Sequence, residues 1–210
     1  MNQIKQDYVT ARFLLVLSRY EGLNLNFVDK HVTIIDTLDY GMHNIYIELV
    51  KASFRCFYDI LDKIAYFIND YIELEIPDRE ISFQRVWYSD RKTEMIHKKI
   101  GDTKNLSLNA LFDMCRDFES GPYKKLRKTR NALTHRFIYV RMFQELEDEE
   151  NMVEETLVRR TLELAQLVRN AVIYLLHFVY VEESKKEAEP KGILAPMFAQ
   201  ELPDNLKSYR

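Results

Sequence analysis

The chain has 210 residues and a formal net charge of −3, with 47% apolar and 30% charged residues. This length fits one domain, or one domain with appended helices, and it suffices to bury a core without disulfides or metal. Only five glycines and five prolines occur, so the composition favours a globular, helix-rich protein. The two cysteines, Cys56 and Cys115, form neither a disulfide framework nor a Cys-x-x-Cys pair, which favours a reducing, intracellular setting.

Signals for export or membrane insertion are weak in this sequence. The N-terminal segment MNQIKQDYVTARF lacks the basic start and the apolar run of a signal peptide. The most apolar stretch, residues 171–181, has about half of the roughly 20 residues that span a bilayer, and His177 interrupts it. We therefore expect a soluble cytoplasmic protein that does not contact a membrane.

The N-terminal third of the sequence predicts two helices. Residues 3–20 carry a plausible apolar stripe that Gly22 ends, while residues 21–37 are ambiguous between a strand, a short helix and a loop. Residues 43–74 give the longest helical signal, since apolar side chains recur there at spacings of three and four. Pro77 is expected to end this helix.

The middle of the chain is predicted to be less regular. Residues 77–90 contain the only tryptophan and are interpreted as an ordered loop, and a short polar helix is expected over 91–99. Ser107 is expected to cap a further helix that runs to about residue 119. Gly121-Pro122 breaks that helix, and Pro122 suits the first turn of the next one.

The C-terminal part predicts one more long helix, over residues 151–182, followed by a charged and then extended tail. Because no convincing strand pairs are found, we predict an all-α helical bundle of about five to six helices. The expected organisation is an N-terminal helix and connection over 1–40, the bundle over 41–182, and a tail over 183–210.

Charge is distributed in blocks. Residues 123–143 carry seven lysines and arginines and no acid, and residues 145–155 carry seven acids and no base. This arrangement can create a local positive field on a net acidic protein. It is also explained if the two blocks complement the dipoles of the helices on which they lie.

The sequence contains no motif for several common kinds of catalytic site. The five histidines are scattered, without HExxH or Cys/His pairs at metal-ligand spacing, and no glycine-rich phosphate loop or Ser/His/Asp signature occurs. The carboxylates Asp59 and Asp62 lie on an amphipathic helix and are expected to pair with Arg55 or Lys63. The sequence therefore predicts no metal and no cofactor.

The segment KKLRKTRNALTHRF, residues 124–137, does suggest chemistry. Arg130 could bind a phosphate bidentately and hold its negative charge, and His135 could transfer a proton near neutral pH. Asn131 lies one turn before His135 and could orient the imidazole. The flanking cations would guide an RNA backbone; they are Lys124, Lys125, Arg127 and Lys128.

The spacing alone is not specific. With fifteen arginines and five histidines, an arginine followed by a histidine at this distance is expected about once by chance. A second pair, Arg91 and His97, has Lys92 directly after the arginine and polar surroundings, and we interpret it as a decoy.

The segment LRKTRNALTHRF resembles the motif of the HEPN superfamily, a group of all-α domains that includes many prokaryotic toxins and defence ribonucleases. In that motif an arginine is followed, usually, by Asn, Asp or His, and then by a histidine after four to six intervening residues. Arg130, Asn131 and His135 match it, and the resemblance extends over about residues 40–182.

The resemblance implies a metal-independent endoribonuclease that acts as a homodimer, with two motifs facing one another across a cleft. It implies a role in toxin–antitoxin systems or antiviral defence, and it leaves room for an antitoxin or other regulatory partner. Some HEPN toxins carry a tyrosine two residues after the histidine, where a partner modifies it. Here that position is Phe137, with Tyr139 two residues further, which puts such control in doubt.

Helix geometry supports a composite site independently. On a straight helix Arg130 and His135 are about 140° apart, so one chain does not easily aim both at one phosphate. A two-fold interface could supply the arginine from one protomer and the histidine from the other.

Two other interpretations are kept. In the first, the chain is a non-catalytic HEPN-like module that binds RNA, a nucleotide or a partner protein. In the second, it is a structural bundle in which Arg130 pairs with an acid from residues 145–155 and His135 is an ordinary helix residue.

Overall fold

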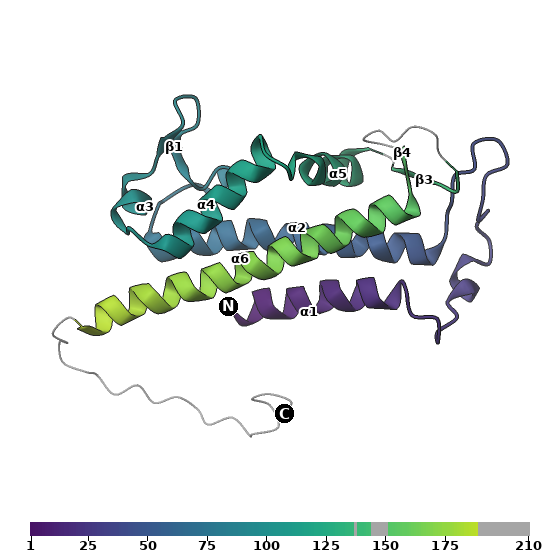
Figure 1. Ribbon diagram of the computed structural model, residues 1–210, viewed down its shortest axis with the longest axis horizontal. Helices are drawn as coiled ribbons and strands as arrows, with labels where there is room; N and C mark the ends of the chain where they lie inside the picture. The colour runs from purple at the N-terminus through teal and green to yellow at the C-terminus, as the bar shows by residue number, and fades with distance from the viewer. Residues whose placement is uncertain (137, 144–150, 189–210) are drawn as a thin grey trace, which may run out of the picture.

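A computed structural model describes residues 1–136, 138–143 and 151–188. Along the chain these residues form the elements α1 (Asn2–Leu17), η1 (Asn26–Asp29), α2 (Ile45–Ile72), η2 (Asp78–Glu80), β1 (Tyr88–Asp90), β2 (Met95–Ile96), α3 (Lys98–Asp102), α4 (Leu106–Glu119), α5 (Lys124–His135), β3 (Tyr139–Arg141), β4 (Asn151–Val153) and α6 (Glu154–Ala188). The predicted all-α bundle of five to six helices is confirmed (Figure 1).

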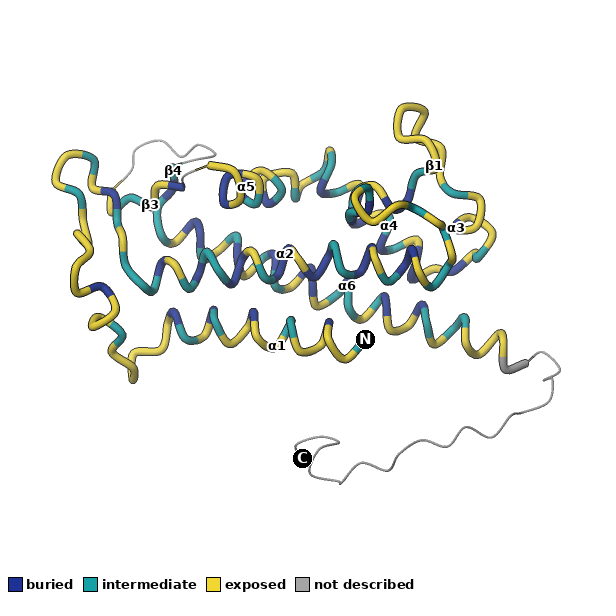
Figure 2. Tube along the Cα trace, turned by 180° about the vertical axis from the view of Figure 1, so that it is seen from behind, coloured by how far each residue is buried: buried dark blue, intermediate teal, exposed yellow. Residues whose placement is uncertain are grey.

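Two long helices, α2 and α6, pack against one another through the middle of the bundle (Figure 1). Helix α1 packs on both of them from one side, whereas α4 and α5 lie on the opposite side. Buried positions lie mainly where these helices face one another, and the outer faces are exposed (Figure 2). The motif helix α5 is thus held against α2 and α4 at the edge of one continuous core.

Helix α2 forms the centre of the core because its apolar residues follow the helical period. Its fully buried side chains include Ile47, Phe54, Phe57, Ile60, Leu61, Ile64 and Ile68. The helix begins after Asn44, whose side chain accepts a hydrogen bond from the Ile47 N–H at 3.0 Å. It ends at Ile72, two residues before the predicted end at residue 74, because Glu73 adopts a left-handed conformation ahead of Pro77.

Helix α1 shares this core. Ile4, Ala11 and Leu15 are buried, and the Ser53 hydroxyl of α2 donates to the Ala11 carbonyl at 2.8 Å. At the surface, Asp7 forms an ion pair with Lys63 of α2 at 2.7 Å. The first helix is therefore packed on α2 along its length.

The predicted polar helix over 91–99 was wrong. Strands β1 and β2 form a short antiparallel hairpin there, and helix α3 follows it. The Asp90 carboxylate accepts hydrogen bonds from the Lys92 N–H and the Thr93 hydroxyl, both at 2.9 Å, and these bonds close the turn. The cap of α4 also differs from the prediction, because Asn105 rather than Ser107 accepts the first N–H groups.

A second strand pair joins α5 to α6. Strand β3 pairs in parallel with β4, which directly precedes α6, so the prediction of no strand pairs was also wrong. Helix α6 continues to Ala188, beyond the predicted end at residue 182. The rest of the predicted tail, 189–210, lies outside the described residues.

By length and composition, α6 is apolar enough to cross a membrane. In the structure much of this apolar character is used in the bundle, since Leu164, Val168, Ala171 and Leu175 are buried in the contacts with the other helices. The hydrophobicity of these four positions is explained by their place in the core of the bundle.

Candidate functional site

Helix α5 presents the predicted motif from a well-anchored position. Its inner face, formed by Leu126, Thr129, Ala132 and Leu133, is buried. The Thr129 hydroxyl donates to the Lys125 carbonyl at 3.0 Å and accepts from Arg160 of α6 at 3.1 Å. Because these contacts fix the rotation of the helix, the direction in which each motif side chain points is also fixed.

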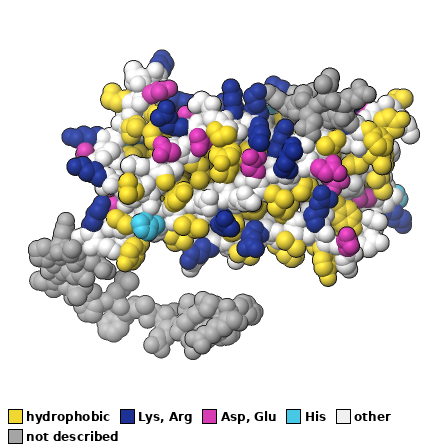
Figure 3. Space-filling view, viewed as in Figure 1, with side chains coloured by type: hydrophobic (Ala, Val, Ile, Leu, Met, Phe, Trp, Pro, Cys, Tyr) yellow, Lys and Arg dark blue, Asp and Glu magenta, His cyan; other side chains and the backbone are white. Residues whose placement is uncertain are grey.

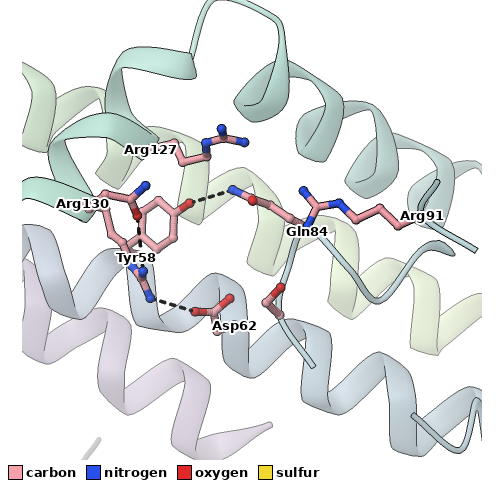
Figure 4. Close-up of a pocket in the computed structure, with 8 residues that line it drawn as sticks. Tyr58, Asp62, Gln84, Arg91, Arg127 and Arg130 are labelled. Atoms are coloured by element: carbon pink, nitrogen blue, oxygen red, sulfur yellow. Dashed lines mark hydrogen bonds and ion pairs between the residues drawn. The ribbon is translucent and has the colours of Figure 1, made fainter. Parts of the chain in front are cut away.

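Next to α5 lies an open cleft with a volume of about 270 Å³ (Figure 4). It is bounded by α2, α5 and the segment that leads through the β1–β2 turn. Its walls are formed by Tyr58, Asp62, Ser82, Gln84, Arg91, Arg127, Arg130 and Asn131. Three guanidinium groups and one carboxylate line it, so the cleft is positively charged and suited to an anion.

Arg130 is the most constrained of the three arginines. Its guanidinium forms an ion pair with Asp62 of α2 at 3.8 Å and lies over the ring of Tyr58, 5.4 Å from the ring centroid. It also donates to the side-chain oxygen of Asn131 at 3.4 Å (Figure 4). The motif arginine is thus held in place on three sides.

Asp62 links this arginine to the loop. Its carboxylate accepts a hydrogen bond from the Phe83 N–H at 2.9 Å. Burial raises the pKa of Asp62, while the Phe83 hydrogen bond and Arg130 oppose that shift. The expected pairing of Asp62 with Arg55 or Lys63 was wrong, because its partner is Arg130.

Tyr58 completes the floor of the cleft. Burial, reinforced by the nearby Asp62 carboxylate, raises the pKa of Tyr58 to about 12, so its hydroxyl stays protonated near neutral pH. That hydroxyl accepts a hydrogen bond from the Gln84 amide at 3.3 Å (Figure 4). The cleft therefore combines cations with neutral hydrogen-bonding groups.

Arg127 and Arg91 face the same cleft from different elements. Arg127 lies one turn before Arg130 on α5, and within the described part of the chain its side chain forms no hydrogen bond or ion pair. Arg91 forms an ion pair with Glu119 of α4 at 3.4 Å. Arg91 was interpreted from the sequence as part of a decoy motif, yet the fold brings it beside the predicted site.

His135 does not line this cleft. It is the last residue of α5 and is exposed. Among the described residues, the side chain of Asn131 accepts a hydrogen bond from Arg130 and forms none with His135. Each residue of an α-helix turns about 100°, which separates His135 from Arg130 around the axis of α5. Within one chain, Arg130 and His135 are not brought to a common point.

The three lysines predicted to contact RNA lie on the outer surface of α5. Lys124, Lys125 and Lys128 are all exposed on α5, and Lys125 forms an ion pair with Glu163 of α6 at 3.2 Å. Basic side chains gather in Figure 3 over the part of the surface where Figure 1 places α5. Together with Arg127 in the cleft, they give this part of the molecule a basic character.

Two further predictions concern segments that are only partly described. Phe137 and most of the acidic stretch, 144–150, lie outside the described residues, and Tyr139 is half-exposed in β3. The structural interpretation paired Arg130 with an acid from 145–155. In the described part of that stretch, Glu154 pairs with Arg19 at 2.6 Å, whereas Arg130 pairs with Asp62.

Sequence reasoning missed several residues of the cleft. Tyr58 and Asp62 lie one turn apart on α2, and a carboxylate inside an otherwise buried stripe is a signal that could have identified Asp62. Ser82 and Gln84 lie in an irregular loop and carry no pattern.

Comparison with known proteins identifies the family. Among curated proteins and among solved structures, none matches this chain. A family model described as LA2681-like HEPN matches residues 1–182, which include α1 as well as the motif helix. The chain therefore belongs to the LA2681-like HEPN family.

Proposed function

We propose that this protein is a metal-independent endoribonuclease in which Arg130 binds the phosphate to be cleaved and His135 transfers protons. The observation that carries the proposal is the position of Arg130, held by Asp62 and Tyr58 at an open, positively charged cleft. A fixed guanidinium can stabilise charge that develops on a phosphate without reorganising during the reaction.

The chemistry needs only proton transfer and charge stabilisation. The ribose 2′-oxygen attacks the adjacent phosphorus and loses its proton to a base, and the bond from phosphorus to the 5′-oxygen breaks. The departing 5′-oxygen takes up a proton, so the products are a 2′,3′-cyclic phosphate and a 5′-hydroxyl. Histidine suits these transfers because its ordinary pKa is near 6.5.

A composite site in a homodimer is part of this proposal. His135 is exposed at the end of α5, whereas Arg130 is turned toward α2 and the cleft. A second copy related by a two-fold axis could place its His135 at the phosphate that Arg130 holds. Asn131, bonded to Arg130, would then position the arginine and contact the substrate.

The direct test is cleavage of a mixed RNA pool in EDTA by wild type, Arg130→Ala and His135→Ala. We expect products ending in 2′,3′-cyclic phosphate from the wild type alone. Equal cleavage by all three proteins would show that the site is wrong or that a contaminating nuclease is present.

Mixing the two inactive variants tests the composite site. If arginine and histidine come from different protomers, random exchange makes half of the dimers mixed, and each mixed dimer has one intact site. About a quarter of wild-type activity should return. A site within one chain would give no recovery.

The biological role proposed is that of a toxin or an antiviral defence ribonuclease, with room for an antitoxin or regulatory partner. Expression in a bacterial host should then arrest growth for the wild type and not for His135→Ala. Equal growth in both cases, with active enzyme in vitro, would contradict a toxin role.

A second candidate is a non-catalytic module that binds RNA, a nucleotide or a partner protein. It is favoured by one observation, namely that Arg130 already has a carboxylate partner and His135 lies outside the cleft. This candidate predicts RNA affinity that Arg130→Ala weakens, without cleavage by any of the proteins.

A further inference from the structure

The cleft contains one arginine, Arg127, whose side chain makes no ion pair or hydrogen bond with the described part of the protein. Arg127 is partly buried in the cleft wall. Arg130, one turn further along α5, is by contrast held by Asp62, Tyr58 and Asn131. A guanidinium that is partly withdrawn from water without a counter-ion is well placed to accept an anionic ligand.

Arg91 approaches the same space from the β1–β2 turn (Figure 4). Its ion pair with Glu119 is 3.4 Å long and its side chain is 53% exposed. An ion pair this exposed contributes little to stability, so a phosphate can displace the carboxylate at small cost. Two arginines from separate elements can therefore converge on one anion in this part of the cleft.

We propose that Arg127 and Arg91 form a second phosphate subsite, which binds the RNA phosphate next to the one held by Arg130. This inference rests on the proposed function, because it takes an RNA strand as the ligand. The subsite lies on the side of Arg130 that is away from His135, since Arg127 precedes Arg130 on α5.

The spacing of the two arginines fits successive phosphates of one strand. Residues three apart on a helix are neighbours on its surface, with Cβ atoms about 5–6 Å apart. The side chains can therefore reach groups separated by one nucleotide step. Gln84, Ser82 and the Tyr58 hydroxyl, which also line the cleft, are neutral groups that can hydrogen-bond the sugar or base between the two phosphates.

The test uses a short RNA with one cleavage position, mapped in the cleavage assay and blocked by a 2′-deoxy nucleotide there. A neutral methylphosphonate then replaces the phosphate on either side of that position in turn. For the wild type, one of the two replacements should weaken binding about tenfold or more, as loss of a charged hydrogen bond predicts. Arg127→Gln should bind the unmodified RNA more weakly and should be insensitive to that same replacement.

Salt dependence gives an independent measure. Removing one phosphate contact should lower the slope of log Kd against log salt concentration by about 0.7 for a single strand. Arg127→Gln and Arg91→Gln should each show this reduction, and Arg127→Lys should keep the slope. Arg12→Gln, an equal change of charge on α1 at the opposite side of the bundle, should leave it unchanged.

The outcomes separate this inference from the proposed function. If the wild type cleaves RNA, and Arg127→Gln matches its rate, its salt slope and its methylphosphonate profile, the subsite is refuted and the nuclease stands. If no protein cleaves RNA but the salt slope still depends on Arg127 and Arg91, the nuclease is refuted and the phosphate contact is supported. A slope reduced equally by Arg12→Gln would refute the subsite, because the effect would then be one of net charge.

Discussion

The support of Arg130 by Asp62 can be tested by replacing the aspartate with alanine and with asparagine. Asp62 has two contacts of different kinds, a hydrogen bond from the Phe83 N–H at 2.9 Å and the ion pair with Arg130 at 3.8 Å. Alanine removes both contacts. Asparagine removes the charge but keeps an oxygen that can accept the Phe83 hydrogen bond.

The two contacts are expected to differ in magnitude. Phe83 is 2% exposed, so an N–H group left without an acceptor there should cost about 1–3 kcal/mol. The ion pair involves side chains that are 30% and 29% exposed and is worth about 1 kcal/mol or less. We expect Asp62→Ala to lower the free energy of unfolding by about 2 kcal/mol, and Asp62→Asn to change it by less than about 1 kcal/mol.

Thermal unfolding followed by circular dichroism can resolve this difference. In a chain of this length about 1 kcal/mol corresponds to a shift in Tm of about 2–4 °C, so alanine should lower Tm by about 4–8 °C. Denaturation in urea provides the same comparison at constant temperature. An alanine variant as stable as the wild type, or an asparagine variant as unstable as the alanine one, would refute the reasoning.

The same pair of proteins gives a pH dependence with a definite sign. Because burial raises the pKa of Asp62, the folded state favours its protonated form more than the unfolded state does. The stability of the wild type relative to Asp62→Asn should therefore be greatest below the ordinary aspartate pKa of about 3.9. It should fall as the pH rises through the higher pKa of the folded state, and the opposite trend would contradict the assigned shift.

Three further predictions concern the motif helix and the core. Arg130→Lys keeps the charge but not the planar fork, so RNA cleavage should fall at least about tenfold while the salt slope of binding is unchanged. Thr129→Val removes the buried hydroxyl that accepts from Arg160, and should lower the free energy of unfolding by about 1–2 kcal/mol in urea denaturation. Burial raises the pKa of Cys115 to about 12, so this thiol should react with a disulfide reagent at pH 8 only after unfolding, and the less buried Cys56 should react first.

The helices that form the core could be predicted from the sequence because their determinants are local. The three- and four-residue spacing of apolar side chains in residues 43–74 specifies one buried face, and α2 buries that face. The motif helix was predicted for a similar reason, and its buried and exposed sides follow from the same period. The angular separation of Arg130 and His135 also needs only the helical repeat.

The hairpin at β1 and β2 could not be predicted from this periodicity. Its turn depends on hydrogen bonds from the Asp90 side chain, and the adjoining Trp87 donates to the Phe83 carbonyl at 2.6 Å. The polar composition of 91–99 is compatible with an exposed helix as well as with a hairpin. Contacts with the rest of the structure therefore determine which of the two forms. The hairpin positions Arg91 at the cleft, where we propose the second phosphate subsite.

The sequence by itself determined the helical class, the family motif and the separation of its arginine and histidine around the helix, because those depend on the local pattern within one helix. Only the tertiary structure decided which side chains meet. It pairs Asp62 with Arg130, brings Gln84 and Arg91 to the same cleft, and leaves Arg127 facing that cleft. These residues lie on separate elements, and the packing of α2, α4 and α5 around a shared core sets the distances between them.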